Sequence, residues 1–530
     1  MEDSRNPSRG LSRRTLLGAA LGTGVVVTAG GLLLPGDGPV RRALREAAEG
    51  PPRQGGRIRA ACMSLSTGDT LDPAKGSLSS DYVRHFMLYN CLTELDRDQR
   101  AVPSLAQAIE SNDQALWHIT LRKGVTFHDG KSLTSADVVY SLLRHKNPAT
   151  ASKLAAIAEQ FTAIEATGPL TLTIQLAGPN ADLPVMLAQS HFAIIADGEK
   201  RFTGGNGTGP YRMTAFTPGV RTLVQRNRNY WKPGKPYLDE IELIGIPDEV
   251  SRVNALLSGD VHMVLAVNAR STQRIAGSAR HIVRETPSSL YSNLIMRQDQ
   301  LPTSNPHFVA GIKQMMDRPL IKRALFRDYA TIANDQPIPP FHTYYRADLP
   351  QTTLDLDKAR WHFAKAGIGT ARLPIFASPA AEGSVDMASI LQEYGARAGL
   401  NLAVNRVPAD GYWSTHWMKH PLGFGNTNPR PTADLIFSLF YKSDAAWNES
   451  GWKNPRFDSL LLEARGEADE ARRKQLYGEM QGLVRDHCGV GIPVFISLLD
   501  GYDRRLKGWY PVPLGGFMGY GFAEHLWWED

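Results

Sequence analysis

The sequence predicts an α/β protein with more than one domain. The chain has 530 residues, more than one hydrophobic core normally organises, so two or three domains are expected. Apolar residues make up 42% of the chain, which is ordinary for globular packing. From Arg57 onward, segments with the two-residue alternation of strands are interspersed with segments of helical spacing, without internal repeats.

The first half supplies the clearest strands. In "WHITLRKGVTF", Trp117, Ile119 and Leu121 alternate on one face, Lys123 and Gly124 form a turn, and Val125 and Phe127 resume the alternation, which predicts a hairpin. "LTLTIQL" alternates in the same way at Leu170, Leu172, Ile174 and Leu176.

Three helices are predicted from caps and spacing. "LTSADVVYSLL" has Thr134 as N-cap and Asp137 three positions later, with Val139, Tyr140 and Leu143 on the expected buried face. "LDKARWHFAKAG" places Ala359, Phe363 and Ala366 on one stripe and ends at Gly367. "ARRKQLYGEMQGLVRDHCG" does the same with Leu476, Met480, Leu483 and Val484 and ends at Gly489.

The net charge gives no indication of a nucleic-acid partner. It is +6 for the whole chain, and residues 1–56 hold eight arginines and five acids, which accounts for half of that excess. The remainder is nearly balanced, without a basic stripe interleaved with exposed aromatics.

The N-terminus carries an arginine pair, Arg13 and Arg14, directly before an apolar run at residues 16–34. This is the layout of a twin-arginine export signal, whose translocase passes folded cargo. The alternative is a membrane anchor, because the run has 19 residues and about 17 span a bilayer. Either interpretation places the globular part in the periplasm or another extracytoplasmic space, released or tethered by this run. Residues 35–56, rich in Pro, Gly and Arg, are predicted to be a linker.

Cysteines are few: Cys62, Cys91 and Cys488, with no CxxC pair. Their spacing does not indicate a zinc or iron-sulfur cage. Buried free thiols are the favoured interpretation, and a Cys62–Cys91 disulfide is left open.

Several blocks of the chain together resemble family 5 extracytoplasmic solute-binding proteins, the peptide, nickel and opine receptors of ABC importers. The four main blocks are "WHITLRKGVTFHDGKSLTSADVVYSLLR", "GTGPYRM", "RNRNYWKPGKPYLDEIELIGIPD" and "ALLSGDVHM". "TLDPAKG", "DLDKARWHFAKAGI" and "WNESGWKNPRFDSLLLEAR" agree with them in order and spacing. The resemblance extends from about Gly56 to Trp528.

The resemblance implies a two-lobed periplasmic-binding-protein fold of class II, cluster C type, with an extra inserted subdomain. Its implied division is a signal and linker at 1–56; a first-lobe core at 57–96, 204–297 and 496–530; an inserted subdomain at 97–203; and a second lobe at 298–495. "GTGPY" is implied to be a crossover on the hinge side between lobes; the alternative is an ordinary tight turn.

The resemblance also implies function. The lobes close over a small-molecule ligand by hinge motion, and the closed form docks on a membrane permease. The expected protein is a monomer without cofactor and without enzymatic activity. Its partners are the ligand, the ABC permease complex and, during export, the twin-arginine translocase.

In peptide-binding relatives, the loop aligned with "GFGNTNPRP" supplies an aromatic residue and, three positions on, an aspartate for the ligand's α-ammonium. Those positions here are Phe424 and Thr427. The anchoring acid is therefore missing, and a buried ammonium would lack its counter-charge, at a cost of about 3–5 kcal/mol. The segment, predicted as a loop, offers Asn426, Thr427, Asn428 and Arg430 instead, groups that suit hydroxyls, amides, a carboxylate or a phosphate. The alternative for Arg430 is a structural pair with Asp434, one helical turn on.

Further ligand contacts are predicted from aromatics and from one polar loop. Tyr412, Trp413 and Phe424 are candidates for flat walls around a ligand, whereas Trp417 and Trp452 are expected in the core. In the first lobe, the polar loop of "CMSLSTGDTLDPA" offers Met63, Ser64 and Ser66.

An exported enzyme is the competing class, but the chain has no GxGxxG after a strand, no GxSxG, no P-loop and no HExxH. His416 and His420, four residues apart, are weak metal candidates if their segment is helical. Two histidines leave ligands unaccounted for, so no bound metal is predicted. A nickel-chelate receptor of the same fold is the remaining alternative.

Overall fold

The computed structural model describes residues 27–28, 31–32, 50–64 and 66–529. The chain divides into two units, residues 1–53 and 54–530. In the first, β1 (Val27–Thr28) and β2 (Gly31–Leu32) pair antiparallel. Arg13, Arg14 and most of the apolar run lie outside the described residues. Within the part of the chain that the structure describes, no helix is long and apolar enough to cross a membrane.

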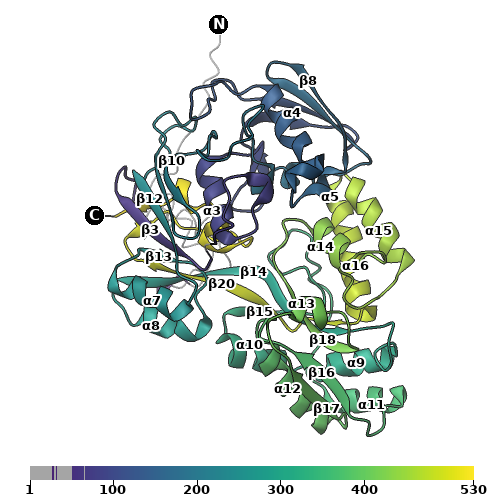
Figure 1. The fold of residues 1–530 in the computed structure, drawn as a ribbon. Coiled ribbons are helices and arrows are strands. Elements are labelled where there is room, and N and C mark those ends of the chain that lie inside the picture. The colour runs from purple at the N-terminus through teal and green to yellow at the C-terminus, as the bar shows by residue number, and fades with distance from the viewer. Residues whose placement is uncertain (1–26, 29–30, 33–49, 65, 530) are drawn as a thin grey trace. The chain divides into compact units, whose positions relative to one another are not determined.

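A ten-stranded sheet organises the second unit (Figure 1). Its main path runs β10-β11-β12-β3-β13-β20-β14-β18, with β15 on β20 and β19 on β14. The strands are β3 (Arg57–Cys62), β10 (Tyr211–Thr217), β11 (Arg221–Arg226), β12 (Glu240–Gly245), β13 (Met263–Val264), β14 (His281–Met296), β15 (Ala330–Ile332), β18 (Leu422–Thr427), β19 (Val490–Gly491) and β20 (Val494–Asp503). In this sheet the parallel pairs are those of β3 with β12 and with β13.

The long strand β14 joins the two lobes. Its first part pairs with β20, from His281 opposite Asp503 to Leu290 opposite Ile496, with a bulge between Thr286 and Leu290. Its last six residues pair with β18. Figure 1 shows β14 and β20 running from the region of β3 and β12 toward the region of β16–β18. The predicted two-lobed layout is thus held together by shared strands.

The first lobe packs helices on the β3 end of the sheet. They are α3 (Ser79–Leu88), α7 (Glu249–Ser258), α8 (Thr272–Ala276) and α17 (Gly516–Gly519), with the C-terminal pair β21 (Leu506–Lys507) and β22 (Trp527–Trp528). Helix α3 starts where Asp81 accepts the backbone amides of Ser77 and Leu78, both at 3.0 Å. Its Val83 and Met87 then enter the core.

The predicted hairpin at residues 117–127 is wrong. A separate sheet of order β6-β7-β9-β8 contains β6 (Ala106–Glu110), β7 (Leu116–Leu121), β8 (Phe161–Gly168) and β9 (Thr171–Leu176). Trp117, Ile119 and Leu121 are buried as predicted, but β7 pairs with β6 and β9, and not with the segment after Gly124. Val125 and Phe127 are buried under a small turn closed by a Thr126–Ser132 bridge.

Helix α4 (Ser135–Leu143) confirms the predicted cap and corrects the predicted face. The Asp137 carboxylate accepts both the backbone amide and the hydroxyl of Thr134 at 2.8 Å. The buried apolar residues are Val138 and Leu142, whereas Val139 and Tyr140 are half-buried and Leu143 is exposed. The stripe of Val138 and Leu142, one position before the predicted stripe, is therefore the face of α4 that packs on the β6–β9 sheet. Smaller elements complete this region: β4 (Thr93–Leu95), β5 (Ala101–Pro103), α5 (Ala155–Ala158) and α6 (Leu183–Met186).

The second lobe has two cores. One surrounds the parallel pair β16 (Leu373–Ala377) and β17 (Leu402–Arg406) with α9 (Pro306–Gln314), α10 (Arg318–Phe326), α11 (Leu356–Ala366), α12 (Ser384–Arg397) and α13 (Tyr412–Thr415). The other joins α14 (Ala433–Phe440), α15 (Pro455–Gly466) and α16 (Glu470–His487). Helix α11 ends at Gly367, which has φ 68°. Helix α16 buries Leu476, Met480 and Val484 as the spacing predicts, whereas the predicted Leu483 is only half-buried.

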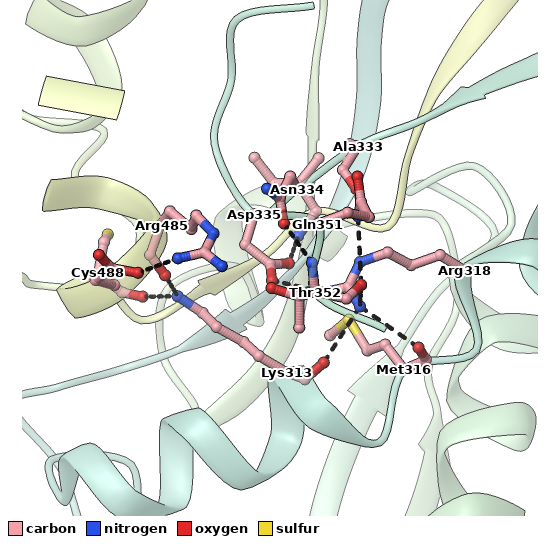
Figure 2. Close-up of polar contacts among 12 residues, drawn as sticks. Lys313, Met316, Arg318, Ala333, Asn334, Asp335, Gln351, Thr352, Arg485 and Cys488 are labelled. Carbon is pink, nitrogen blue, oxygen red and sulfur yellow. Dashed lines mark hydrogen bonds and ion pairs between the residues drawn. The ribbon is translucent and has the colours of Figure 1, made fainter. Parts of the chain in front are cut away.

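A buried charge network ties α9 and α10 to the strands (Figure 2). Arg318 donates to the Asp335 carboxylate at 2.5 Å, and that carboxylate also accepts the Ile492 amide at 3.0 Å, just before β20. Lys313 donates from Nζ to the carbonyls of Arg485 and Cys488, both at 2.8 Å. Each of these buried charges thus has a partner, as the cost of desolvation requires.

The cysteines and the "GTGPY" turn are structural. Cys62, Cys91 and Cys488 are free and buried, so the disulfide left open above is absent. A Cβ on Gly207 or Gly209 would lie 2.1 Å or 2.4 Å from backbone atoms of Leu88. Glycine is therefore required at both positions, because the segment passes very close to the end of α3. The segment leads into β10 inside the first lobe, so it is not a crossover between lobes.

Candidate ligand-binding site

The polar segment predicted as a loop is mostly a strand. Residues 422–427 form β18, which pairs antiparallel with β14, with Thr427 opposite Tyr291. Only residues 428–431 are irregular before Thr432 caps α14, its hydroxyl accepting the Leu435 amide at 3.1 Å. The segment therefore presents its polar residues from the end of a rigid sheet.

The three polar residues before the prolines differ in exposure. Asn426 is half-buried and donates to the Ser292 hydroxyl at 3.1 Å. Thr427 is buried with 1% exposure, and Asn428 is exposed. Asn428 is thus the residue of the three most open to a solute, while Asn426 and Thr427 shape the surface behind it.

Two residues predicted as ligand walls belong to the core. Phe424 is fully buried and Tyr412 is 1% exposed, both within the second-lobe cluster. The Tyr412 hydroxyl donates to the Phe424 carbonyl at 2.7 Å and accepts its amide at 3.2 Å. Neither ring is exposed, because strand formation turns Phe424 into the lobe and the Tyr412 hydroxyl bonds the backbone of the same strand.

Trp413 is the exposed aromatic of this region. It is 42% exposed and meets Trp417 edge to face, with ring centroids 5.8 Å apart. Trp417 packs on the core and donates from Nε1 to Glu449 at 2.7 Å, and Trp452 is 6% exposed. Trp413 therefore remains a candidate for ligand contact, and Trp417 and Trp452 are core residues as predicted.

Glu449 is a buried acid behind β18. It is 4% exposed and accepts from Asn293 and Trp417, each at 2.7 Å, without a basic partner among the described residues. Burial raises its pKa to about 7. A Cβ on Gly425 would lie 2.1 Å from its carboxylate. This acid is held by Asn293 of β14 and by Trp417 and supports the strand, so it does not replace the missing aspartate.

Arg430 does not form the structural pair that its spacing allowed. Asp434 instead accepts from Arg465 of α15 at 3.0 Å. Among the described residues Arg430 has no ion pair; its contacts are the Pro429 carbonyl at 3.4 Å and the Phe440 ring at 5.9 Å. Burial lowers its pKa, opposed by the hydroxyl groups of Tyr291 and Tyr82.

The first lobe contributes Tyr82, which interacts electrostatically with Arg430 and which sequence reasoning missed. Tyr82 of α3 lies 5.3 Å from Tyr520 and 5.4 Å from His191 between ring centroids. Both ring nitrogens of the buried His85 lack a hydrogen-bond partner within the described part of the chain, and burial lowers its pKa to about 3. One sequence signal could have indicated Tyr82: Tyr82 and Phe86 are four residues apart and form a half-buried aromatic stripe on α3, beside the buried stripe that contains Val83.

The predicted first-lobe loop lies next to this wall. Met63 is 48% exposed. The Ser64 hydroxyl lies 3.1 Å from that of Ser79, the first residue of α3. Ser66 is turned into its own loop, where its hydroxyl accepts the Gly68 amide at 3.1 Å. Met63 and Ser64 therefore stay candidates for ligand contact more readily than Ser66 does.

The lobes also touch directly. Asp182, just before α6, pairs with Arg473 of α16 at 2.8 Å, and both side chains are buried. The Ala181 amide donates to the Arg465 carbonyl at 2.9 Å. These contacts hold the β6–β9 region against the α15–α16 region.

The histidine pair does not sit on one helix, since α13 ends at Thr415. The two rings still meet, with His416 Nδ1 and His420 Nε2 3.1 Å apart, and His420 stacks on Phe376 at 3.5 Å. Among the described residues there is no group of three or more His, Cys, Asp or Glu that could hold a metal ion.

A large hollow of about 870 Å³ lies elsewhere, along the exposed face of α4 between Tyr140, Arg144 and Phe202. A small cavity of about 10 Å³, barely room for one water, adjoins Arg430 and Ser289. Of the two, the small cavity is the one lined by a residue of the candidate site, Arg430.

The chain is similar to known binding proteins over most of its length. The family model "Bacterial extracellular solute-binding proteins, family 5 Middle" matches residues 100–449. The glutathione-binding protein GsiB of Escherichia coli is 24% identical over 470 residues, covering 84% of this chain and 91% of the relative.

Solved structures share the fold. The periplasmic binding protein DppA from Helicobacter pylori, in complex with peptide STSA, superposes with a TM-score of 0.74 at 21% identity, covering 90% of this chain and 99% of the other. AgaA from A. tumefaciens, in complex with agropinic acid, gives a TM-score of 0.73 at 21% identity, covering 90% and 99%. The two-lobed α/β architecture of the binding proteins is thereby confirmed.

Proposed function

Because the chain belongs to the bacterial extracellular solute-binding proteins of family 5, we propose that it is the substrate-binding protein of an ABC importer, capturing a small polar solute between its lobes for delivery to a permease. The supporting observation is the position of residues 426–430 at the end of β18, where Arg430 comes within electrostatic reach of Tyr82 in the other lobe. The solute is peptide-like, opine-like or glycoside-like and is bound without chemical change.

The proposed contacts come from both lobes. The second lobe contributes Asn428, Arg430 and Trp413, with Asn426 and Thr427 behind them. The first lobe contributes Tyr82, with Met63 and Ser64 at its edge. The absence of an acid at Thr427 argues against anchoring a free α-ammonium, since a buried ammonium without a counter-charge is strongly unfavourable.

A ligand screen tests this function. Peptides, opines, glycosides and nickel chelates are added to the purified protein, and a binder should raise the melting temperature because it binds only the folded state. Calorimetry should then give one solute per chain, and mass spectrometry should recover that solute unaltered. A chemical product that accumulates would exclude the binding-protein class, and a response to nickel chelates alone would favour the nickel receptor.

Thr427→Asp restores the missing acid. It should raise affinity for peptides with a free amino terminus relative to their N-acetylated forms. A wild-type protein that responds only to free di- and tripeptides would contradict this interpretation of Thr427.

We further propose export by the twin-arginine route, a monomeric protein outside the cytoplasmic membrane, and the lobe boundaries given above. The double replacement Arg13→Lys with Arg14→Lys should leave the protein in the cytoplasmic fraction, whereas the same change at Arg41 and Arg42 should not. Export of the first double variant at the wild-type level would refute the route. Size-exclusion chromatography with light scattering tests the monomer.

A further inference from the structure

Arg430 is a partly buried cation without an acid among the described residues. A guanidinium has five N–H donors, and here one of them makes a single long hydrogen bond of 3.4 Å to a backbone carbonyl. The Phe440 ring, 5.9 Å away, is its other contact. The acid nearest in sequence, Asp434, is held by Arg465. Desolvating a charge without a partner is costly. A bound anion would lower that cost by supplying Arg430 with a counter-charge.

The surroundings of Arg430 are neutral. The small cavity beside it is lined by Ser289, Pro339 and His342, among others, and burial lowers the pKa of His342 to about 4. The Tyr82 hydroxyl in the other lobe interacts electrostatically with Arg430, and the Tyr82 ring packs against those of Tyr520 and His191. Burial also lowers the pKa of His191. Among the described residues that line this cavity, no second cation competes for an anion and no carboxylate repels one.

The opposite wall suits the body of such a solute. The rings of Tyr520 and His191 both lie within 5.4 Å of the Tyr82 ring, measured between centroids. Rings of this kind offer flat apolar surface together with a polar edge. A solute with an acidic end toward the second lobe and a planar or aliphatic body toward the first would satisfy both sides.

We propose that the solute is an organic anion whose carboxylate or phosphate is gripped by the Arg430 guanidinium, with its body resting on the Tyr82–Tyr520 pair. This inference rests on the proposed function and adds to it the charge of the solute. Planar two-point contact with two oxygens is the interaction that distinguishes arginine from lysine. Because the grip comes from one lobe and the ring surface from the other, the anion also couples binding to contact between the lobes.

The test uses the full exported chain and pairs of solutes that differ only in charge. N-acetylated dipeptides as free acids and as amides form one arm, and sugar phosphates with the parent sugars form the other. The wild-type melting temperature should rise with an acid or a phosphate and not with its neutral partner, and the arm that responds identifies carboxylate or phosphate as the group recognised. A neutral partner that binds as tightly as the acid overturns the inference.

Arg430→Gln should weaken binding of the anion by about 100-fold, the range expected when one partner of a buried charge pair is removed. It should leave the melting temperature of the solute-free protein unchanged or higher, because an unpartnered charge is lost. A purely structural arginine would give the opposite sign. Wild-type affinity for the anion in this variant overturns the inference.

Two further variants control for folding and for general loss of charge. Arg122→Gln removes a similarly half-buried arginine that also contacts one carbonyl, of Ser104, and one ring, of Trp231; anion binding should be unchanged. Arg430→Lys keeps the charge but not the two-point grip, so it should bind about 10-fold more weakly and still prefer the acid to the amide. Loss of that preference overturns the inference.

The outcomes separate this inference from the proposed function. If only neutral peptides or sugars bind the wild-type protein, the anion inference falls and the solute receptor stands. If no peptide, opine, glycoside, sugar phosphate or nickel chelate binds, the proposed function falls with it.

Discussion

Replacing Glu449 by Gln should remove a pH dependence from the stability of the second lobe. Burial raises the pKa of Glu449 from its ordinary value of 4.5 to about 7. A group with a raised folded pKa stabilises the fold below its unfolded pKa, and this contribution is lost as pH rises through the folded value. With these two pKa values, the wild-type protein should lose about 2.5 kcal/mol of unfolding free energy between pH 5 and pH 8 through this residue. Gln resembles the protonated acid and should lose none of it.

Urea denaturation at pH 5, 6, 7 and 8, followed by tryptophan fluorescence, measures the difference. The two proteins should be similar in stability at pH 5, and Glu449→Gln should be the more stable at pH 8. Glu165→Gln, an exposed site on β8, serves as the control and should keep the wild-type slope. Parallel pH profiles for wild type and Glu449→Gln would show that the Asn293 and Trp417 hydrogen bonds hold the carboxylate ionised, and would refute the reasoning.

Three further changes test the packing. Asp335→Ala leaves Arg318 buried without a partner and should lower unfolding free energy by about 3–5 kcal/mol in denaturant titration; a loss under about 1 kcal/mol would contradict the role of this pair. Gly425→Ala places a Cβ 2.1 Å from a carboxylate and should lower the melting temperature sharply, whereas Gly423→Ala, whose nearest atom is 3.8 Å away, should not. Asp182→Asn weakens the pair with α16, and solution scattering should report a larger radius of gyration; identical scattering curves would argue that this contact does not hold the lobes together.

The sequence predicted the elements whose signal is local. Thr134 and Asp137 mark the start of α4, and Gly367 ends α11, because caps depend on residues a few positions apart. The alternation at Leu172, Ile174 and Leu176 likewise identified β9. The two-lobed fold and the family came from the resemblance of whole blocks, and the family model and solved structures confirm them.

The errors all involve partners distant in sequence. Asn and Gly are depleted in strands, so β18 was predicted as a loop; it becomes a strand because β14, more than 120 residues earlier, supplies its hydrogen bonds. The same pairing turns Phe424 inward. The interpretation of Arg430 as the partner of Asp434 followed helical spacing, yet Arg465, 31 residues on, takes that acid. Neither β14, the partner of β18, nor Arg465, the partner of Asp434, can be identified from the residues that flank these positions in sequence.

The bulge in β14 has a mechanical consequence. Residues 287–289, "PSS", are the stretch of β14 where its pairing with β20 shifts register, between Thr286 and Leu290, and Pro287 has no amide hydrogen to offer the ladder. The regular ladders on both sides are stiff, so torsion between the halves concentrates in these three residues. Ser289 also borders the cavity beside Arg430, which puts this compliant joint next to the guanidinium of the candidate site.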